Sequence, residues 1–269
     1  MNRNDPIGVF DAGIGGFTVV KEMQELMPKE DVVYFADSAN MPYGNRSEEE
    51  ILHMTRQILD FMAGKKVKAV AVACNTISTL IDRYRDGWPF KIFSVVEAGS
   101  ASIAAIEDAR CVGMIGTVFT AQTKCYNRLI HALKPQVQVV GAGCPNLARL
   151  IDSGSLAPEV IDPELRKAVD SILSQAPVTH LILGCTHYPM VADHLNRLYP
   201  ALKLVNPARE EALAVKNYLA AQGWLKDEGP GSFTVNTTGD PELALAAARR
   251  FGLKMPDQVL KVPAPERLA

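Results

Sequence analysis

The 269-residue sequence lacks any apolar run near the roughly 18 residues that a transmembrane helix needs. Its first residues, MNRNDPIGVF, lack the apolar segment of a secretory signal peptide. The net charge of −2 gives no electrostatic reason to expect nucleic acid or an anionic membrane surface as a partner. We therefore expect a cytoplasmic protein that binds neither membranes nor nucleic acid.

Cysteine is scarce, and its spacing excludes the usual frameworks. The five cysteines are an odd number and none lies in a CxxC pair, which favours reduced thiols over disulfides. Cys74, Cys185 and His187 could be zinc ligands, but paired spacing and a fourth ligand are missing, so no metal is expected. We interpret Cys111, Cys125 and Cys144 as structural.

The sequence also lacks a GxxxxGK[ST] phosphate-binding loop and a complete GxGxxG dinucleotide fingerprint. The nearest feature is the loop DAGIGG at residues 11–16, directly after a short apolar run. Such a loop could hold a phosphate group. It could equally be a tight turn that lets the next helix approach the sheet. Both interpretations stay open.

What the sequence does contain is an alternation of short apolar runs and amphipathic segments, with 48% hydrophobic and 22% charged residues. This alternation predicts an α/β fold with parallel strands. The predicted strands are residues 7–10, 32–36, 67–73, 92–96, 112–115, 138–141, 178–183 and 233–237, with one more strand and a loose tail in the last stretch, residues 255–269. The main predicted helices are residues 17–27, 47–62, 75–84, 120–129, 147–151, 162–175, 208–222 and 241–251.

The second half repeats the order of the first, which indicates a weak internal duplication. In each half a strand ends in a cysteine, within VKAVAVACNT at residues 67–76 and THLILGCTHYP at residues 179–189. Reactive groups in α/β sheets lie beyond the carboxyl ends of the strands. We therefore expect two α/β lobes that face each other, with Cys74 on one and Cys185 on the other.

Two opposed thiols suit one kind of chemistry, the inversion of a carbon centre beside a carboxylate. A base must remove a proton from one face and an acid must return one to the other. A thiol has a reference pKa of about 8.5, near enough to neutrality to serve in either state. The polar residues after each cysteine could then hold the substrate.

The motifs FDAGIGG, MPYG, ACNT, IGT, GCTHYP, VNPA and TTGDPE resemble those of the cofactor-independent glutamate racemases, within the aspartate/glutamate racemase superfamily. The resemblance covers nearly the whole chain. It implies two Rossmann-like (flavodoxin-like) lobes in a pseudo-twofold arrangement, with the active site between them. We place the first lobe at residues 1–98 plus 208–269 and the second at 99–207. It also implies no cofactor, a homodimer, and production of D-glutamate for peptidoglycan.

Residue roles follow from the same resemblance. Cys74 and Cys185 correspond to the acid/base pair, with Asp11 assisting Cys74 and His187 assisting Cys185. The substrate-binding residues that it implies are Ala12, Pro42, Tyr43, Gly44, Asn75, Thr76, Thr117, Thr120 and Thr186.

The chain departs from the usual family pattern at four places. Ala12 replaces a Ser, Ala98 replaces a Pro, Phe119 replaces a small residue, and Asp152 replaces a Glu. None removes a thiol, but they leave two alternatives open. One is the same chemistry on another amino acid such as aspartate. The other is a binding protein such as a DNA gyrase inhibitor, for which the sequence shows no distinctive surface. A cysteine hydrolase is weaker, because no separate His and Asn/Asp pair accompanies either cysteine.

Overall fold

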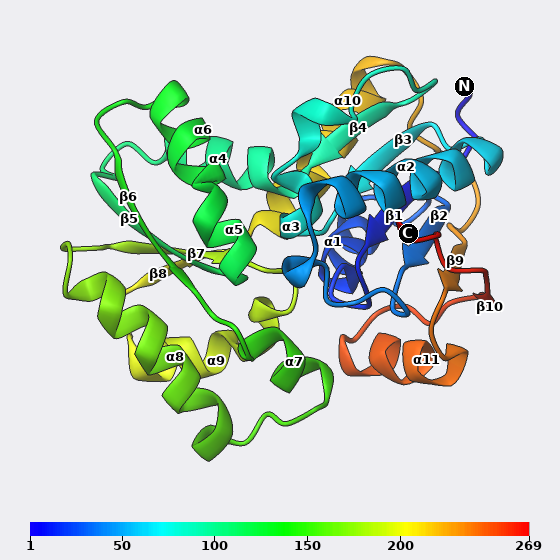
Figure 1. Cartoon of the computed structure of the whole chain (residues 1–269). Helices are drawn as coiled ribbons and strands as arrows, with labels where there is room; N and C mark the ends of the chain where they lie inside the picture. The colour runs from blue at the N-terminus through cyan, green and yellow to red at the C-terminus, as the bar shows by residue number, and fades with distance from the viewer. Residues whose placement is uncertain (269) are drawn as a thin grey trace.

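The computed structural model describes residues 1–268 of the chain. They form two lobes side by side, each built around a sheet of parallel strands, and both chain termini lie on the first lobe (Figure 1). The first sheet has strand order β10-β9-β2-β1-β3-β4 and the second β6-β5-β7-β8. Among residues 1–268 no helix is long and apolar enough to cross a membrane.

The first lobe uses both ends of the chain. Its strands are β1 (Ile7–Asp11), β2 (Val32–Ala36), β3 (Ala69–Val72), β4 (Lys91–Ser94), β9 (Phe233–Thr237) and β10 (Gln258–Lys261). Its helices are α1 (Phe17–Leu26), α2 (Glu48–Gly64), α3 (Asn75–Ser78), α10 (Pro207–Ala221) and α11 (Pro241–Arg250), with short 3-10 turns at η1 (Tyr43–Asn45) and η2 (Ile81–Arg83).

The second lobe is continuous in sequence. Its strands are β5 (Cys111–Gly116), β6 (Gln138–Gly143), β7 (His180–Gly184) and β8 (Lys203–Val205). Its helices are α5 (Val118–Thr123), α6 (Cys125–Leu133), α7 (Leu147–Asp152), α8 (Pro158–Leu173) and α9 (Ala192–Leu198), with the 3-10 turn η3 (Tyr188–Val191). Helix α4 (Val95–Ala105) joins the lobes.

The strand topology confirms the predicted α/β class and the internal duplication. The central order β2-β1-β3-β4 of the first sheet matches β6-β5-β7-β8 of the second, strand for strand in sequence order. Cys74 follows β3 and Cys185 follows β7, so the two cysteines occupy equivalent places. The lobe boundaries at residues 98/99 and 207/208 stay a prediction.

Three predicted elements differ from the structure. The fourth strand ends at Ser94, and residues 95–105 form the unpredicted helix α4, because the Ser94 hydroxyl accepts a hydrogen bond from the Glu97 N–H. The helix predicted for residues 75–84 breaks into α3 and η2. Its Ser78 and Thr79 hydroxyls donate to carbonyls of Val72 and Thr76, a local bonding that competes with a regular helix.

The third difference is a break in the helix predicted for residues 120–129. Lys124 adopts the left-handed conformation, with φ 51°, and separates α5 from α6. Helix α8 also differs, since it begins at Pro158 and not at residue 162, with a proline in its first turn. Two other helix starts follow the sequence signals. Ser47 and Glu50 form the predicted capping box of α2, and Asp240 with Pro241 begins α11.

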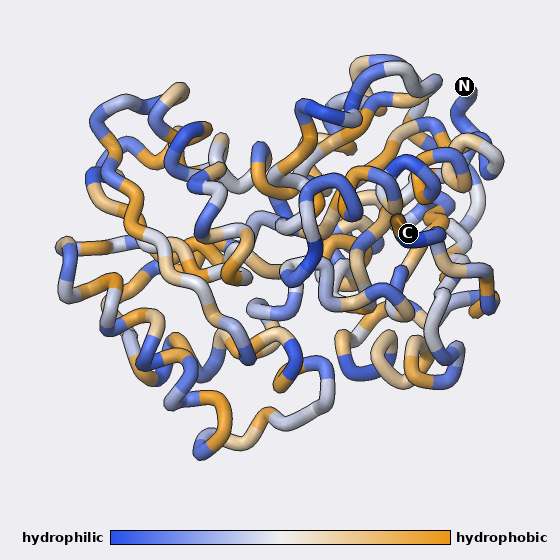
Figure 2. Tube along the Cα trace, viewed as in Figure 1, coloured by the Kyte–Doolittle hydropathy of each residue, from blue (hydrophilic) through white to orange (hydrophobic). Residues whose placement is uncertain are grey.

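The core lies on both faces of each sheet. Strands β1, β3, β5 and β7 are buried at every residue, as expected for parallel strands covered by helices on both sides. Figure 2 shows these apolar segments running through the interior of each lobe, with polar residues concentrated on the outer helices and loops.

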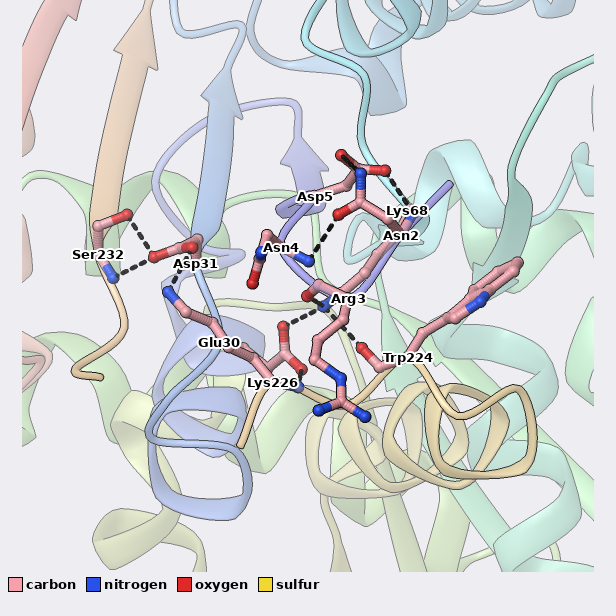
Figure 3. A network of polar contacts seen from close by, with 10 residues as sticks. All are labelled: Asn2, Arg3, Asn4, Asp5, Glu30, Asp31, Lys68, Trp224, Lys226 and Ser232. Atoms are coloured by element: carbon pink, nitrogen blue, oxygen red, sulfur yellow. Dashed lines mark hydrogen bonds and ion pairs between the residues drawn. The ribbon is translucent and has the colours of Figure 1, made fainter. Parts of the chain in front are cut away.

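A buried ion pair ties the distant segments of the first lobe together at the end of the sheet opposite the cysteines. Lys68 is fully buried, and its Nζ lies 2.5 Å from Glu30 Oε2. The same Nζ donates hydrogen bonds to the carbonyls of Arg3, at 2.8 Å, and Trp224, at 3.0 Å. Figure 3 shows that this cluster brings together the N-terminal segment, the residues just before β2 and the segment after α10.

Candidate active site

A cavity of about 60 Å³ lies between the lobes, at the carboxyl ends of β1, β3 and β7. This is the position where ligands bind in open α/β sheets. Its lining residues are Asp11, Ala12, Met41, Pro42, Tyr43, Gly44, Cys74, Asn75, Thr76, Thr117, Ala148, Cys185, Thr186 and His187. The structure therefore brings every sequence-predicted site residue except Thr120 to one cavity.

On the first-lobe side the cavity presents Cys74 beside Asp11. Asp11 ends β1, and the N–H of Gly16 donates to its Oδ2 at 2.9 Å. Burial raises the pKa of Asp11, although the His187 charge and hydrogen bonds from Cys74 and Gly16 oppose the shift. Burial and the Asp11 charge together hold the pKa of Cys74 well above its usual value. The Cys74 sulfur is therefore a protonated thiol near neutral pH.

On the second-lobe side Cys185 lies beside His187, whose Nδ1 is 3.8 Å from the Cys185 sulfur. His187 Nε2 lies 3.6 Å from Asp152 Oδ1 at the end of α7, an ion-pair distance. Burial alone would lower the pKa of His187, but Asp152, Cys185 and the Asp11 charge raise it to about 10. The His187 imidazolium therefore places a positive charge beside the Cys185 sulfur.

The glycine-rich loop allows the two lobes to approach each other. A Cβ atom at Gly15 would lie 2.4 Å from Thr186 Oγ1 and 2.6 Å from His187 Cε1, so only glycine fits. Thr186 in turn donates from its hydroxyl to Asp11 Oδ2 at 3.4 Å. Of the two interpretations of this loop, the geometry favours the close-packed turn over a phosphate cradle.

The remaining polar lining is uncharged. Asn75, Thr76, Thr117 and Thr186 contribute an amide and hydroxyls, and Thr76 Oγ1 meets Thr117 Oγ1 across the lobes at 3.1 Å. Among residues 1–268 no lysine or arginine lines the cavity. Carboxylate groups of a ligand would therefore depend on neutral donors and on the His187 imidazolium.

Three side chains are placed differently from the simplest expectation. Thr120 is fully buried behind the cavity wall, where its hydroxyl contacts Thr117 Oγ1 at 2.9 Å. The Tyr43 hydroxyl donates to Asp37 Oδ2 at 2.6 Å, which leaves its ring and backbone to face the cavity. Phe119 does not line the cavity but packs against the first-lobe apolar cluster that contains Tyr43.

The sequence analysis missed Met41 and Ala148 as lining residues, and it noted Asp152 only as a departure from the family pattern. Met41 could have been found from its place in MPYG, whereas Ala148 on α7 carries no signal. All five cysteines are buried as free thiols. Within residues 1–268, no three His, Cys, Asp or Glu side chains converge as a metal site requires.

Nearly the whole chain is similar to known racemases in sequence. The Asp/Glu/Hydantoin racemase family profile matches residues 8–213. Glutamate racemase 1 from Caldanaerobacter subterraneus subsp. tengcongensis is 34% identical over 252 residues, which cover 93% of this chain and 94% of that protein. Glutamate racemase from Thermoanaerobacter pseudethanolicus is 35% identical, covering 96% and 97% of the two chains.

Solved structures agree with the sequence relatives. Glutamate racemase isoform RacE1 from Bacillus anthracis superposes with a TM-score of 0.93 at 28% identity, over 99% of this chain and 100% of that one. The Thermus thermophilus enzyme, solved with β-chloro-D-alanine, gives a TM-score of 0.85 at 35% identity, over 98% of both chains. Fold, cavity and relatives together define an isomerase, an amino-acid racemase. The chain belongs to the Asp/Glu/Hydantoin racemase family.

Proposed function

We propose that this chain interconverts L- and D-glutamate by a cofactor-independent, two-base proton transfer, in the cytoplasm, and that it supplies D-glutamate for peptidoglycan. The observation that carries the proposal is that Cys74 and Cys185, one from each lobe, line the same cavity. The similarity to glutamate racemases over nearly the full chain supports glutamate as the substrate.

In the proposed reaction from L-glutamate, the Cys185 thiolate removes the α-proton. The C–H bond breaks, its electron pair stays on the α-carbon, and a Cys185 thiol forms. The Cys74 thiol then gives its proton to the opposite face, forming the new C–H bond and leaving a Cys74 thiolate. Reaction from D-glutamate runs in the reverse order.

The charged groups beside the two sulfurs differ in sign. The pKa of Cys74 is raised by burial and by Asp11, which keeps this thiol protonated as an acid. In the proposed mechanism Cys185 is the base for L-glutamate, and the His187 imidazolium, with its Nδ1 3.8 Å from the Cys185 sulfur, supplies a positive charge next to it. Asp11 assists Cys74 when it must instead take a proton from D-glutamate.

The binding part of the proposal assigns the substrate carboxylates to neutral donors. These are the side chains of Asn75, Thr76, Thr117 and Thr186 and the backbone N–H groups of Tyr43, Gly44 and the Ala12 segment. Ala12 stands where the family resemblance implies a Ser, so one hydroxyl donor is missing from this part of the cavity. That difference is the observation behind the second candidate, the same chemistry on another amino acid such as aspartate.

Proton exchange in D₂O tests the proposal directly. The protein is incubated with each of a panel of amino acids, and loss of the Cα–H signal is followed by NMR. We expect glutamate to exchange fastest. Faster exchange of aspartate would replace glutamate with aspartate as the substrate, and no exchange with any amino acid would reject the two-base mechanism for this chain.

The quaternary structure belongs to the same proposal, since the family resemblance implies a homodimer. Light scattering of the purified protein distinguishes a dimer from the 29.2 kDa monomer. A monomer that still exchanges the glutamate α-proton would leave the catalytic proposal intact and would reject the proposed homodimer.

A further inference from the structure

We propose that Tyr126, on helix α6 of the second lobe, is a positioning residue that holds the Asn75 carboxamide of the first lobe with its Nδ2 facing the cavity. The inference rests on the proposed binding role of Asn75 and deepens it. It assigns to Nδ2, and not to Oδ1, the contact with a substrate carboxylate.

The first step is the hydrogen bond itself. The Tyr126 hydroxyl donates to Asn75 Oδ1 at 2.8 Å, between side chains that are 0% and 3% exposed. Within residues 1–268 the hydroxyl has no second hydrogen-bond partner. The buried carboxyl of Glu211 acts on Tyr126 through its charge, but neither of its oxygens has a hydrogen-bond partner within residues 1–268. It therefore does not accept the proton of the Tyr126 hydroxyl. A buried phenol needs an acceptor for its proton, and Asn75 Oδ1 supplies it.

The second step is the direction in which the amide then points. With Oδ1 occupied by Tyr126, the Nδ2 group has no protein acceptor among residues 1–268. Nδ2 is not among the side-chain nitrogen and oxygen atoms that are both fully buried and without a hydrogen-bond partner. Asn75 also lines the cavity. Nδ2 is therefore open to a ligand. Burial holds the pKa of Tyr126 well above its usual value, so the phenol remains a donor across the working pH range.

The third step is that the Tyr126 ring packs against α4, the helix that joins the lobes, close to the start of α10. A Cβ atom at Gly99 on α4 would lie 3.3 Å from Tyr126 Cε1 and 2.9 Å from Pro207 Cγ at the start of α10. The ring thus packs where glycine leaves room for it. Since the cavity offers no lysine or arginine, a neutral amide in the right orientation matters for carboxylate binding.

Tyr126→Phe tests the assignment because it removes only the hydroxyl. Without it the carboxamide can rotate, and one neutral hydrogen bond to substrate is lost for part of the time. We expect the KM for the racemised amino acid to rise about threefold to tenfold, with kcat within twofold of the parent value. In an Asn75→Ala background the same change should leave KM unaltered.

A matched control is Tyr84→Phe, which removes a buried phenol hydroxyl that donates to the backbone carbonyl of Ile77. A carbonyl cannot rotate, so this variant should not change KM. A fall in kcat without a rise in KM for Tyr126→Phe, or an equal effect in the Asn75→Ala background, would overturn the positioning role.

Asn75→Asp gives a second test that keeps the Tyr126 bond, because an aspartate oxygen still accepts from the phenol. The other oxygen then replaces Nδ2 and repels a substrate carboxylate, so KM should rise more than in Asn75→Ala. An unchanged or lower KM would mean that an acceptor faces the cavity, and the assignment would be wrong. If the parent enzyme exchanges an amino acid other than glutamate, these comparisons are made with that substrate. That result rejects the glutamate proposal and leaves the Tyr126 test standing.

Discussion

The two cavity cysteines differ in the charge that lies beside each sulfur. Cys74 has the Asp11 carboxylate as a neighbour, whereas Cys185 has an imidazolium whose pKa is raised to about 10. Different environments around two paired groups are a general way for such groups to acquire separate acid and base roles. The duplicated fold supplies two similar sites, and these neighbours make them unequal.

Restoring the missing hydroxyl with Ala12→Ser should tighten substrate binding. Ala12 is 8% exposed and lines the cavity, so a serine there can reach a bound carboxylate. One neutral hydrogen bond contributes about 0.5–1.5 kcal/mol, so kcat/KM for glutamate should rise about threefold to tenfold. Steady-state kinetics with both enantiomers measure this, with Ala148→Ser, on the second-lobe wall, as control. No change or a fall in kcat/KM would indicate a cavity shaped for a different substrate.

The raised pKa of His187 also predicts a pH-dependent stability. In the folded protein it is about 10 and the ordinary value is 6.5, so protonation of this group favours folding. Its contribution is complete below about pH 6.5 and is lost as the pH rises through about 10. The free-energy difference between the parent and His187→Asn should therefore shrink across that range, measured by urea unfolding at several pH values.

Asp152→Asn is the companion variant, because its carboxylate is a main cause of the raised His187 pKa. It should move the loss of stability to lower pH. A parent-to-variant difference that stays constant from pH 6 to 10 would contradict a protonated, buried His187.

At the scale of single elements, helix ends determine where the site residues lie. Ser94 begins α4 directly after β4, and Lys124 separates α5 from α6, so that Tyr126 can reach Asn75. The periodicity of apolar residues does not predict these two helix ends. The start of α4 depends on one hydrogen bond to the Ser94 hydroxyl, and the break between α5 and α6 depends on the backbone conformation of Lys124. Element boundaries are accordingly where sequence and structure differ most.

Removing a cap should weaken one helix measurably without touching the cavity. Ser47 Oγ accepts from the Glu50 N–H, and the Glu50 carboxylate accepts from the Ser47 N–H. Ser47→Ala should lower the free energy of unfolding by about 0.5–2 kcal/mol, with kcat/KM unchanged. Ser174→Ala, at the C-terminal end of α8, is the matched control and should have little effect. Equal losses in both variants would mean that the capping box contributes nothing specific.

At the scale of the whole molecule, the lobes depend on contacts between distant parts of the chain. The first sheet combines residues 7–94 with residues 233–261, and Lys68 joins the segments at one end of it (Figure 3). The cavity residues come from both lobes. The stability of the first lobe and the formation of the cavity therefore both require the whole folded chain, and neither half of the sequence would supply them alone.

Breaking the buried ion pair should be costly. Lys68→Met leaves the Glu30 carboxylate buried without its cation, which typically costs about 3–5 kcal/mol of unfolding free energy. The exposed pair Arg83–Glu48 has side chains that are 52% and 47% exposed, and Arg83→Met should cost less than about 1 kcal/mol. Urea unfolding compares the two. Similar small losses would mean that the Lys68 cluster does not hold the lobe together.

The proposed two-base mechanism predicts what each cysteine does alone. A substrate analogue with a leaving group on the β-carbon can eliminate after one proton is removed, so it needs only one base. Cys74→Ser should process only the L form, which the proposal assigns to Cys185, and Cys185→Ser only the D form. Racemisation should be nearly abolished in both, because a serine hydroxyl is a far weaker acid than a thiol.

The rate of elimination is measured from the release of the leaving group, and the variant with both cysteines replaced serves as the blank. If each single variant eliminated from both enantiomers, the assignment of one base to each lobe would be wrong. If only one of the two cysteines mattered for either enantiomer, a single-cysteine reaction would replace the two-base mechanism.

The sequence by itself determined the fold class and the duplication, and it predicted which residues carry the chemistry. Apolar periodicity is local, and the ACNT and GCTHYP segments carry their cysteines at the ends of predicted strands. The tertiary structure alone decided which side chains meet. Asp152 lies beside His187 and Tyr126 lies beside Asn75, and each of these contacts joins elements that are distant in sequence. Phe119 lies away from the cavity because it packs against the apolar cluster of the first lobe. Burial, which raises the pKa of Cys74 and encloses His187, likewise exists only once the two lobes close around the cavity.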